Sequence, residues 1–234
     1  MIKNNKELKN KITALLPMKG HSERVPNKNI RSFAGIPLFH HIADVLQKST
    51  YVDSIVINTD SEIIAREAKS HFSKAKIIER PSLICGDTVP MNEIISYDLS
   101  VLEGEHFLQT HSTNPLLTMA TLEKAIKEYL SLDTRNDSLF SVTKLQTRLY
   151  WENGAPINHD PQKLLRTQDL PPIYEENSNI YLFSRESFKN AGNKRIGLKA
   201  KLFVIDALEA MDIDTEDNFT LAEAVYHLKN RNQG

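Results

Sequence analysis

Short apolar runs alternate with amphipathic helical patterns along the first 130 residues, and this alternation constrains the fold more than any other feature. Strands are predicted at residues 12–18, 54–59, 76–80 and 106–111. After each run, apolar residues recur at the 3.6-residue period of a helix that buries one face. This order predicts an α/β fold in which a mostly parallel central sheet is flanked by helices.

The second half of the chain keeps strand and helix patterns but contains one long irregular segment. Strands are predicted at 138–145, 179–183 and 201–205, and a closing helix is predicted from Glu216 with Thr215 as its cap. Residues 149–172 are rich in proline and include Trp151, so they form either a functional loop or an arm that packs on another subunit. The length predicts a single domain over residues 1–234, with the arm at about 145–175.

Charge and composition exclude several classes of protein. A formal net charge of -1 lacks the broad excess of Lys and Arg that a nucleic-acid-binding surface needs. No stretch approaches the roughly 20 apolar residues of a membrane span, and residues 1–11 are not followed by the apolar run of a signal peptide. The single cysteine, Cys85, excludes an internal disulfide. We expect a cytoplasmic protein that binds neither nucleic acid nor membranes.

A basic loop follows the first predicted strand, which is where open α/β sheets bind ligands. It contains Lys19, Arg24 and Lys28, and Gly20 permits close approach of the backbone. Cations and backbone N–H groups in one loop form a pocket for phosphates, and a triphosphate would suit it. The alternative is a solvated surface loop. The loop has neither the P-loop motif nor G-x-G-x-x-G, which counts against P-loop kinases and NAD enzymes.

Two carboxylates, Asp212 and Asp214, are separated by one residue near the other end of the chain. In an extended segment they project to the same side, with Cα atoms about 6–7 Å apart. Mg²⁺ takes carboxylates together with phosphate oxygens, so this pair is a candidate metal site. The alternative is that one Asp caps the following helix, but Thr215 is better placed for that role.

Polar residues also follow the other predicted strands, at the same expected edge of the sheet. Asp60 follows the second strand, and its expected role is a helix cap or a turn. Arg80 follows the third strand and Gln109 the fourth, and such planar hydrogen-bonding groups suit a base or a sugar. Of the eight histidines, His111, in the loop after the fourth strand, is the only one that we single out as a site candidate, and we expect no cluster of histidine metal ligands.

Six segments, taken in order, resemble the acylneuraminate cytidylyltransferase family, also called CMP-sialic acid synthetases. They are the loop from Lys19 to Asn29, Ala34-Gly35 with Pro37-Leu38, Asn58-Thr59-Asp60, Arg80-Pro81 with Asp87-Thr88, Gln109 with Pro115-Leu116, and Asp212-Ile213-Asp214-Thr215. The resemblance runs from about Ile12 to the carboxyl end. It implies a nucleotidyltransferase fold of the Rossmann-like, GT-A-like type, and a homodimer.

The resemblance also implies a reaction, in which an anomeric hydroxyl attacks the α-phosphorus of CTP and releases pyrophosphate. Lys19, Lys28 and Asp214 are implied to be catalytic, and Asp212 and Asp214 are implied to bind Mg²⁺. The residues implied to bind CTP or the acidic sugar are Ser22, Arg24, Asn29, Arg80, Asp87, Gln109, Thr113, Asn114, Arg166, Gln168 and Asn177.

Three departures from the family pattern leave the acceptor open. Lys19 stands where the family has Arg, Glu23 and Arg24 replace Lys-Gly, and Glu175 replaces an Arg near the anionic substrate. The resemblance therefore implies sialic acid or a related acid such as pseudaminic, legionaminic or an octulosonic acid. Two alternatives remain: a nucleotidyltransferase for another acceptor such as a sugar 1-phosphate, and a nucleotide-binding module without catalysis.

Overall fold

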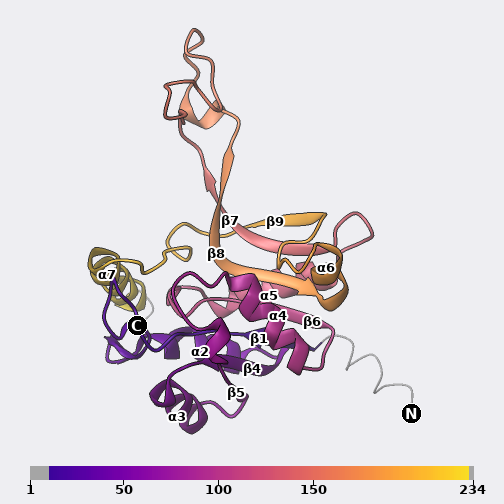
Figure 1. Cartoon of the computed structure of the whole chain (residues 1–234). Helices are drawn as coiled ribbons and strands as arrows, with labels where there is room; N and C mark the ends of the chain where they lie inside the picture. The colour runs from indigo at the N-terminus through magenta and orange to yellow at the C-terminus, as the bar shows by residue number, and fades with distance from the viewer. Residues whose placement is uncertain (1–10, 232–234) are drawn as a thin grey trace.

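A seven-stranded sheet forms the centre of the computed structural model, which describes residues 11–231 (Figure 1). Its order is β5-β4-β1-β6-β8-β7-β9. The strands are β1 (Ile12–Leu15), β4 (Val52–Thr59), β5 (Ala75–Glu79), β6 (His106–Gln109), β7 (Ser138–Leu145), β8 (Ile173–Ser184) and β9 (Ala200–Val204). Within this sheet only β8 runs antiparallel to its neighbours, which confirms the predicted mostly parallel α/β sheet. The amino-terminal segment discussed above lies outside the described residues, apart from Lys11.

Helices cover both faces of the sheet. Helices α2 (Leu38–Lys48), α3 (Glu62–His71) and α5 (Met119–Leu130) contribute to one apolar cluster, and α4 (Met91–Val101) and α6 (Arg185–Asn190) contribute to another. Strand β4 shows why the sheet needs both layers: Ile55 and Ile57 belong to the first cluster and Val56 to the second. Consecutive apolar residues are therefore buried on opposite faces, as expected for a parallel strand. None of the helices in residues 11–231 has the length and hydropathy that a bilayer crossing requires.

The last helix, α7 (Glu216–Arg231), packs against the early part of the chain. Arg31, beside the small β2–β3 hairpin (Ser32–Phe33 and Ile36–Pro37), donates to both carboxylate oxygens of Glu216 at 2.7 and 2.6 Å. Its guanidinium also lies 4.2 Å from the ring centre of Phe219. Thr215 caps the helix as predicted, since its hydroxyl accepts from the backbone N–H of Asn218 at 3.2 Å. This packing places the last helix against the first loop and the β2–β3 hairpin.

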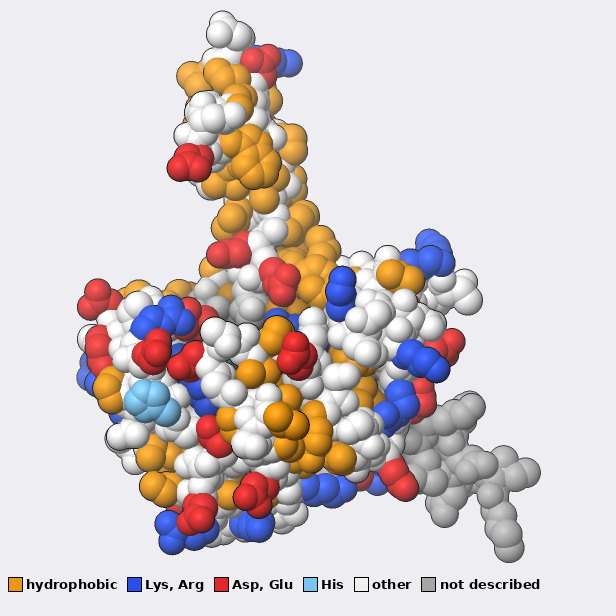
Figure 2. Space-filling model, viewed as in Figure 1, with side chains coloured by type: hydrophobic (Ala, Val, Ile, Leu, Met, Phe, Trp, Pro, Cys, Tyr) orange, Lys and Arg blue, Asp and Glu red, His pale blue; other side chains and the backbone are white. Residues whose placement is uncertain are grey.

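Residues 146–172 protrude from the sheet as a continuation of the β7–β8 hairpin (Figure 1). The protrusion contains a bridge between Tyr150 and Pro156 and the short helix η3 (Thr167–Asp169). Figure 2 shows many apolar side chains along this slender arm. Trp151 is 63% exposed and Leu164 is 86% exposed, which is unusual for residues of this size.

Several predicted element boundaries were wrong by a few residues. Strands β1, β5 and β6 end at Leu15, Glu79 and Gln109, before the predicted ends at 18, 80 and 111. Strand β8 begins at Ile173, six residues before the predicted 179, because it also pairs with β7 along the base of the arm. The six-residue helix α6 was not predicted, because it is too short to show a helical period. The polar residues beyond the shortened strands form the loops of the site.

Candidate active site

A polar cavity of about 500 Å³ lies where the parallel strands end. Its walls include the first loop, the loops after β5 and β6, and the segment before α7. This is the position at which open α/β sheets bind ligands. The sequence-predicted residues that line it are Lys19, Ser22, Arg24, Lys28, Asn29, Arg80, Asp87, Thr113, Asp212 and Asp214.

The first loop curls back on itself around Asn29. The Asn29 amide donates to the Lys19 carbonyl oxygen at 2.8 Å, and its Oδ1 accepts from the Ser112 hydroxyl at 2.6 Å. Val25, between the loop cations, is fully buried in the apolar cluster that includes Phe219 of α7. These contacts fix the loop, so its cations are held at the cavity rather than in bulk solvent.

Gly20 fits the first loop tightly against the turn between β4 and α3. Its N–H donates to Asp60 Oδ1 at 2.6 Å, and a Cβ atom at this position would lie only 2.9 Å from Ser61 Cβ. Asp60 does not cap α3, because Ser61 is the residue that accepts from the N–H of Ile64. It lies at the bend between β4 and α3, which agrees with the expected turn. Asp60 also holds the first loop.

The acid pair is held by the residue between its two members. Ile213 is fully buried, its N–H donates to the Thr113 carbonyl oxygen at 3.0 Å, and its own carbonyl accepts from Lys28 Nζ at 2.6 Å. Since neighbouring side chains of an extended segment point to opposite sides, Asp212 and Asp214 both line the cavity. The structure thus joins the first loop to an acid pair that lies almost 190 residues further along the chain.

Carboxylates surround the cations of the first loop. Lys19 pairs with Asp87, Arg24 Nη2 donates to Asp214 Oδ1 at 2.9 Å, and Lys28 Nζ lies 3.7 Å from the same oxygen. Burial lowers the pKa of Lys28, although both members of the acid pair act against this effect. The loop cations are therefore arranged around the acid pair, with Lys28 the least exposed of the three.

Asp212 is the more buried carboxylate of the acid pair. Burial raises its pKa, and the nearby charge of Asp214 raises it further, while hydrogen bonding from Thr113 lowers it. Its Oδ1 atom is buried and has no hydrogen-bond partner. Two adjacent carboxylates, one with an unpartnered buried oxygen, form a donor set that fits Mg²⁺.

Arg80 reaches the cavity from a buried polar network. Its Nε and Nη2 atoms donate to the side chain and the backbone oxygen of Asn58, each at 2.8 Å. Asn58 in turn donates to Asp98 Oδ1 at 2.6 Å. Burial raises the pKa of Asp98 to about 6, while the bond from Asn58 and the charge of Arg80 lower it. Asp98 was not predicted, because it lies inside the α4 pattern.

Arg195, in the loop after α6, also lines the cavity. Its guanidinium stacks 3.7 Å from the ring centre of Tyr181 and donates from Nη1 to Gln109 Oε1 at 2.6 Å. The nearest described carboxylate, Glu176, lies 3.9 Å away, and the Arg195 side chain is 16% exposed. Gln109 therefore lies behind Arg195 instead of lining the cavity. Burial, with the charges of Arg195 and Lys28, lowers the pKa of His111 to about 3, so this imidazole at the cavity wall is neutral.

A β-bulge supplies the neighbouring part of the wall. The pairing of β7 with β8 shifts register after Phe140, and the bulged Ser178 adopts a left-handed φ of 58° and lines the cavity. Asn177 accepts from the Ser141 hydroxyl at 2.6 Å and donates to Thr143 Oγ1 at 3.0 Å. Asn177 is therefore not part of the cavity wall, contrary to the implied role in binding substrate. Its two side-chain hydrogen bonds stabilise the bulge.

A family model described as cytidylyltransferase matches residues 13–230 of the chain. The chain belongs to this cytidylyltransferase family. It is 24% identical over 223 residues to the pseudaminic acid cytidylyltransferase of Campylobacter jejuni, covering 91% of this chain and 94% of that protein. It is 25% identical over 219 residues to the N-acylneuraminate cytidylyltransferase of Streptococcus agalactiae, covering 88% of this chain and 51% of that protein.

A solved structure supports the fold of this family member. The CTP complex of CMP:2-keto-3-deoxy-manno-octonic acid synthetase has a TM-score of 0.69 to this chain at 11% identity, covering 94% of this chain and 99% of the other. At this identity the likeness shows the nucleotidyltransferase fold alone.

Besides Gln109 and Asn177, three further residues implied to bind substrate do not line the cavity. Asn114 is fully buried, and neither polar atom of its side chain has a hydrogen-bond partner. Arg166 and Gln168 lie at η3 on the exposed arm, where Arg166 Nε pairs with Asp169 at 2.7 Å. The cause is the hairpin, which carries them away from the sheet (Figure 1).

Sequence reasoning missed Arg195 and Ser178. Arg195 lies in a polar, Lys-rich loop after α6, which has the composition of an ordinary solvated surface. The only signal for Ser178 is the Asn-Ser-Asn run that interrupts the apolar pattern of β8. Both residues enter the site through tertiary packing.

Proposed function

We propose that this cytidylyltransferase transfers CMP from CTP to the anomeric hydroxyl of a sialic-acid-like nonulosonic acid and releases pyrophosphate. The observation that carries the proposal is one cavity lined by the basic first loop, the acid pair and Arg195. Family membership supports the nucleotide, and relatives named for pseudaminic and N-acylneuraminic acids support the class of acceptor.

The first loop would hold the triphosphate. The pairs that Lys19 and Arg24 form with Asp87 and Asp214 are partly exposed, and such pairs contribute only about 0–1 kcal/mol. A triphosphate can therefore take over these cations at little cost. In the transfer, the anomeric oxygen bonds to the α-phosphorus and loses its proton, while the bond to the departing pyrophosphate breaks. The loop cations neutralise the charge that develops on the phosphates.

The acid pair would hold Mg²⁺, and the unpartnered Asp212 Oδ1 supports this assignment. When bound by Asp212 and Asp214, Mg²⁺ supplies positive charge next to the phosphate oxygens. Burial of Ile213 keeps both carboxylates aimed into the cavity, and Lys28 is fixed beside them by the Ile213 carbonyl. The chain's own contribution is therefore position and charge.

Arg195 would bind the carboxylate of the acidic sugar. Each cation of the first loop has a carboxylate partner, and two donors of Arg80 are taken by Asn58. Arg195 has a neutral partner, Gln109, and a distant one, Glu176, so several of its donors are left for a ligand. A planar guanidinium matches a carboxylate in bidentate geometry, and its stacking on Tyr181 fixes its orientation.

The arm would form a homodimer. Its exposed Trp151 and Leu164 are apolar surface that a second copy would cover. In such a dimer Arg166 and Gln168 are carried outward and can reach the partner's cavity, which is how these implied substrate contacts would be satisfied. We also place the protein in the cytoplasm, in keeping with its single cysteine.

The reaction is tested with purified protein, CTP, Mg²⁺ and a panel of pseudaminic, legionaminic, N-acetylneuraminic and octulosonic acids. Release of pyrophosphate and a CMP-sugar with a nonulosonic acid is expected, and none with an Asp214→Asn control. Turnover only with the octulosonic acid, or with UTP or GTP and a sugar 1-phosphate, would instead support another acceptor. CTP binding without any product would support a nucleotide-binding module.

The dimer is tested by sedimentation of the whole chain at micromolar concentration. We expect a dimer for the wild type and a monomer for the double variant Trp151→Ser, Leu164→Ser, because the covered apolar area would be lost. Leu198→Ser, an exposed leucine outside the arm, serves as control. A monomeric wild type would contradict the proposed dimer but would not contradict the proposed reaction.

A further inference from the structure

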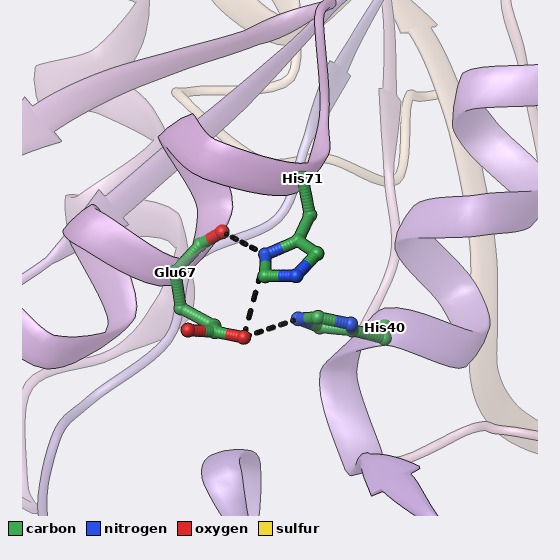
Figure 3. A group of neighbouring side chains, drawn as sticks. All are labelled: His40, Glu67 and His71. Carbon is green, nitrogen blue, oxygen red and sulfur yellow. Dashed lines mark hydrogen bonds and ion pairs between the residues drawn. The ribbon is translucent and has the colours of Figure 1, made fainter.

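Two histidines and a glutamate meet outside the cavity, on helices α2 and α3 (Figure 3). His40 belongs to α2, whereas Glu67 and His71 lie one turn apart on the same face of α3. The sequence did not lead us to expect this grouping, because it does not show that α2 and α3 are neighbours in space. Neither the first loop nor the acid pair contributes to this cluster.

The three side chains present nitrogen and oxygen atoms at close range. One potential ligand atom from each residue lies within 4.8 Å of the other two. Glu67 Oε1 is 3.5 Å from His40 Nε2 and 3.3 Å from His71 Nδ1. Metal–ligand bonds of about 2.0–2.2 Å in a tetrahedral site place the ligand atoms roughly 3.3 Å apart. Small rotamer adjustments would therefore bring all three onto one ion.

His40 gives an independent indication of a ligand. Its side chain is only 9% exposed, and its buried Nε2 atom has no hydrogen-bond partner although it faces Glu67. Edge-on packing against Phe72, with ring centres 5.0 Å apart, holds the imidazole in this orientation. Leaving a buried polar atom unpartnered is costly, so native proteins usually provide a partner.

His71 is the adjustable member of the cluster. It is half exposed, and its Nδ1 lies 2.9 Å from the Glu67 carbonyl oxygen and 2.9 Å from the Ser70 hydroxyl. His71 can therefore approach an ion with Nδ1, or it can keep its local bond and use Nε2. Its exposure leaves a fourth position that water can occupy.

We propose that His40, Glu67 and His71 bind a first-row divalent transition metal, with Zn²⁺ as the representative ion. Two imidazoles and one carboxylate favour Zn²⁺ and its neighbours, whereas Mg²⁺ prefers oxygen ligands. The ion would tie α2 to α3. Helix α3 begins next to Ser61, against which Gly20 of the first loop packs, so the tie would support the wall of the cavity from behind.

The test uses the full-length chain after treatment with a chelator. Zn²⁺ binding is measured by equilibrium dialysis in excess Mg²⁺, which covers the acid pair, and Co²⁺ is added separately to record its visible spectrum. We expect one Zn²⁺ per chain at micromolar concentration and a tetrahedral Co²⁺ spectrum. Glu67→Gln and His71→Asn should each weaken binding by at least about tenfold, since each removes a ligand. Zn²⁺ should raise Tm in the wild type but not in these variants.

The matched control is His227→Asn, which removes an exposed histidine from α7 and should leave binding unchanged. Both test positions are partly exposed, so the variants should fold, and circular dichroism checks this. No Zn²⁺ binding at micromolar concentration would overturn the proposal. Binding that survives Glu67→Gln and His71→Asn but is lost in Asp212→Asn would also overturn it, because the ion would then lie in the cavity.

Discussion

Two parts of the cavity are built in different ways: the part proposed to bind the nucleotide, here the nucleotide end, and the part proposed to bind the acceptor, here the acceptor end. At the end proposed for the nucleotide, three cations from one short loop face carboxylates of the acid pair and of Asp87. At the end proposed for the acceptor, a single mostly buried guanidinium, Arg195, stacks on an aromatic ring and bonds to a neutral amide. A polyphosphate needs concentrated charge, which a loop can supply locally. One carboxylate needs one oriented donor, which depends on the packing of distant segments.

The largest effect is expected at the acid pair, which lies beside the first loop. Asp212→Asn and Asp214→Asn should each lower turnover about a thousandfold, because charge next to the reacting phosphates is the main source of catalysis in such sites. Pyrophosphate release at saturating CTP measures the loss. The fold should persist, since Thr215 still caps α7 and Ile213 remains buried. Near-normal rates in both variants would show that no essential metal depends on this pair.

The buried network of Arg80, Asn58 and Asp98 is expected to make the stability of the protein depend on pH. Burial raises the pKa of Asp98 to about 6 in the folded protein, above its ordinary value of 3.8. The folded state therefore binds this proton more tightly, and the contribution to stability is present below pH 4 and is lost as pH rises through 6. The loss is on the order of 1–3 kcal/mol, given 1.4 kcal/mol per pKa unit.

Asp98→Asn keeps the shape of the side chain and removes its titration. Urea unfolding at pH 4, 5, 6 and 7 should show the wild type losing stability relative to the variant as pH rises. The carboxamide can still accept from Asn58, so the variant should fold. A stability difference that does not change with pH would mean that Arg80 keeps Asp98 charged throughout.

The nucleotide end could largely be predicted from the sequence because its residues follow strand ends or flank a buried residue. The basic loop after β1 and the Asp-Ile-Asp segment are local patterns, and each side chain's direction follows from strand geometry. The order of strands and helices is equally local, which is why the parallel sheet was predicted. Asp60 shows the limit of prediction from local pattern. Asp60 and Ser61 are adjacent polar residues that could each cap α3, and only the packing of Asp60 against Gly20 shows that Ser61 is the cap.

The acceptor end could not be predicted in the same way. Arg195 becomes a site residue only because the loop after α6 folds over Tyr181, and Ser178 does so only because β8 is bulged. Arg166 and Gln168 were implied to bind substrate but do not line the cavity, because the arm carries them away from it. Packing between neighbouring segments therefore decided the first two positions, and the protrusion of the arm decided the other two.

The smallest effect is expected at the acceptor end. Arg195→Met should raise KM for the acidic sugar about tenfold and leave KM for CTP unchanged, since a hydrogen-bonded ion pair contributes about 1.5 kcal/mol or more. Arg195→Lys keeps the charge but not the planar donors, and should recover part of the loss. Steady-state kinetics with each substrate varied in turn separates the two constants.

Lys194→Met is the matched control, because it removes the neighbouring exposed cation of the same loop. If only the charge of this loop attracted the acidic sugar, Lys194→Met and Arg195→Met would raise its KM equally, and the effect of both would fade with added salt. If Arg195 holds the carboxylate directly, its variant alone changes KM and the change persists in salt, because the guanidinium is mostly buried. A rise in KM for CTP instead would place Arg195 at the nucleotide, and the two ends of the cavity would no longer be distinct.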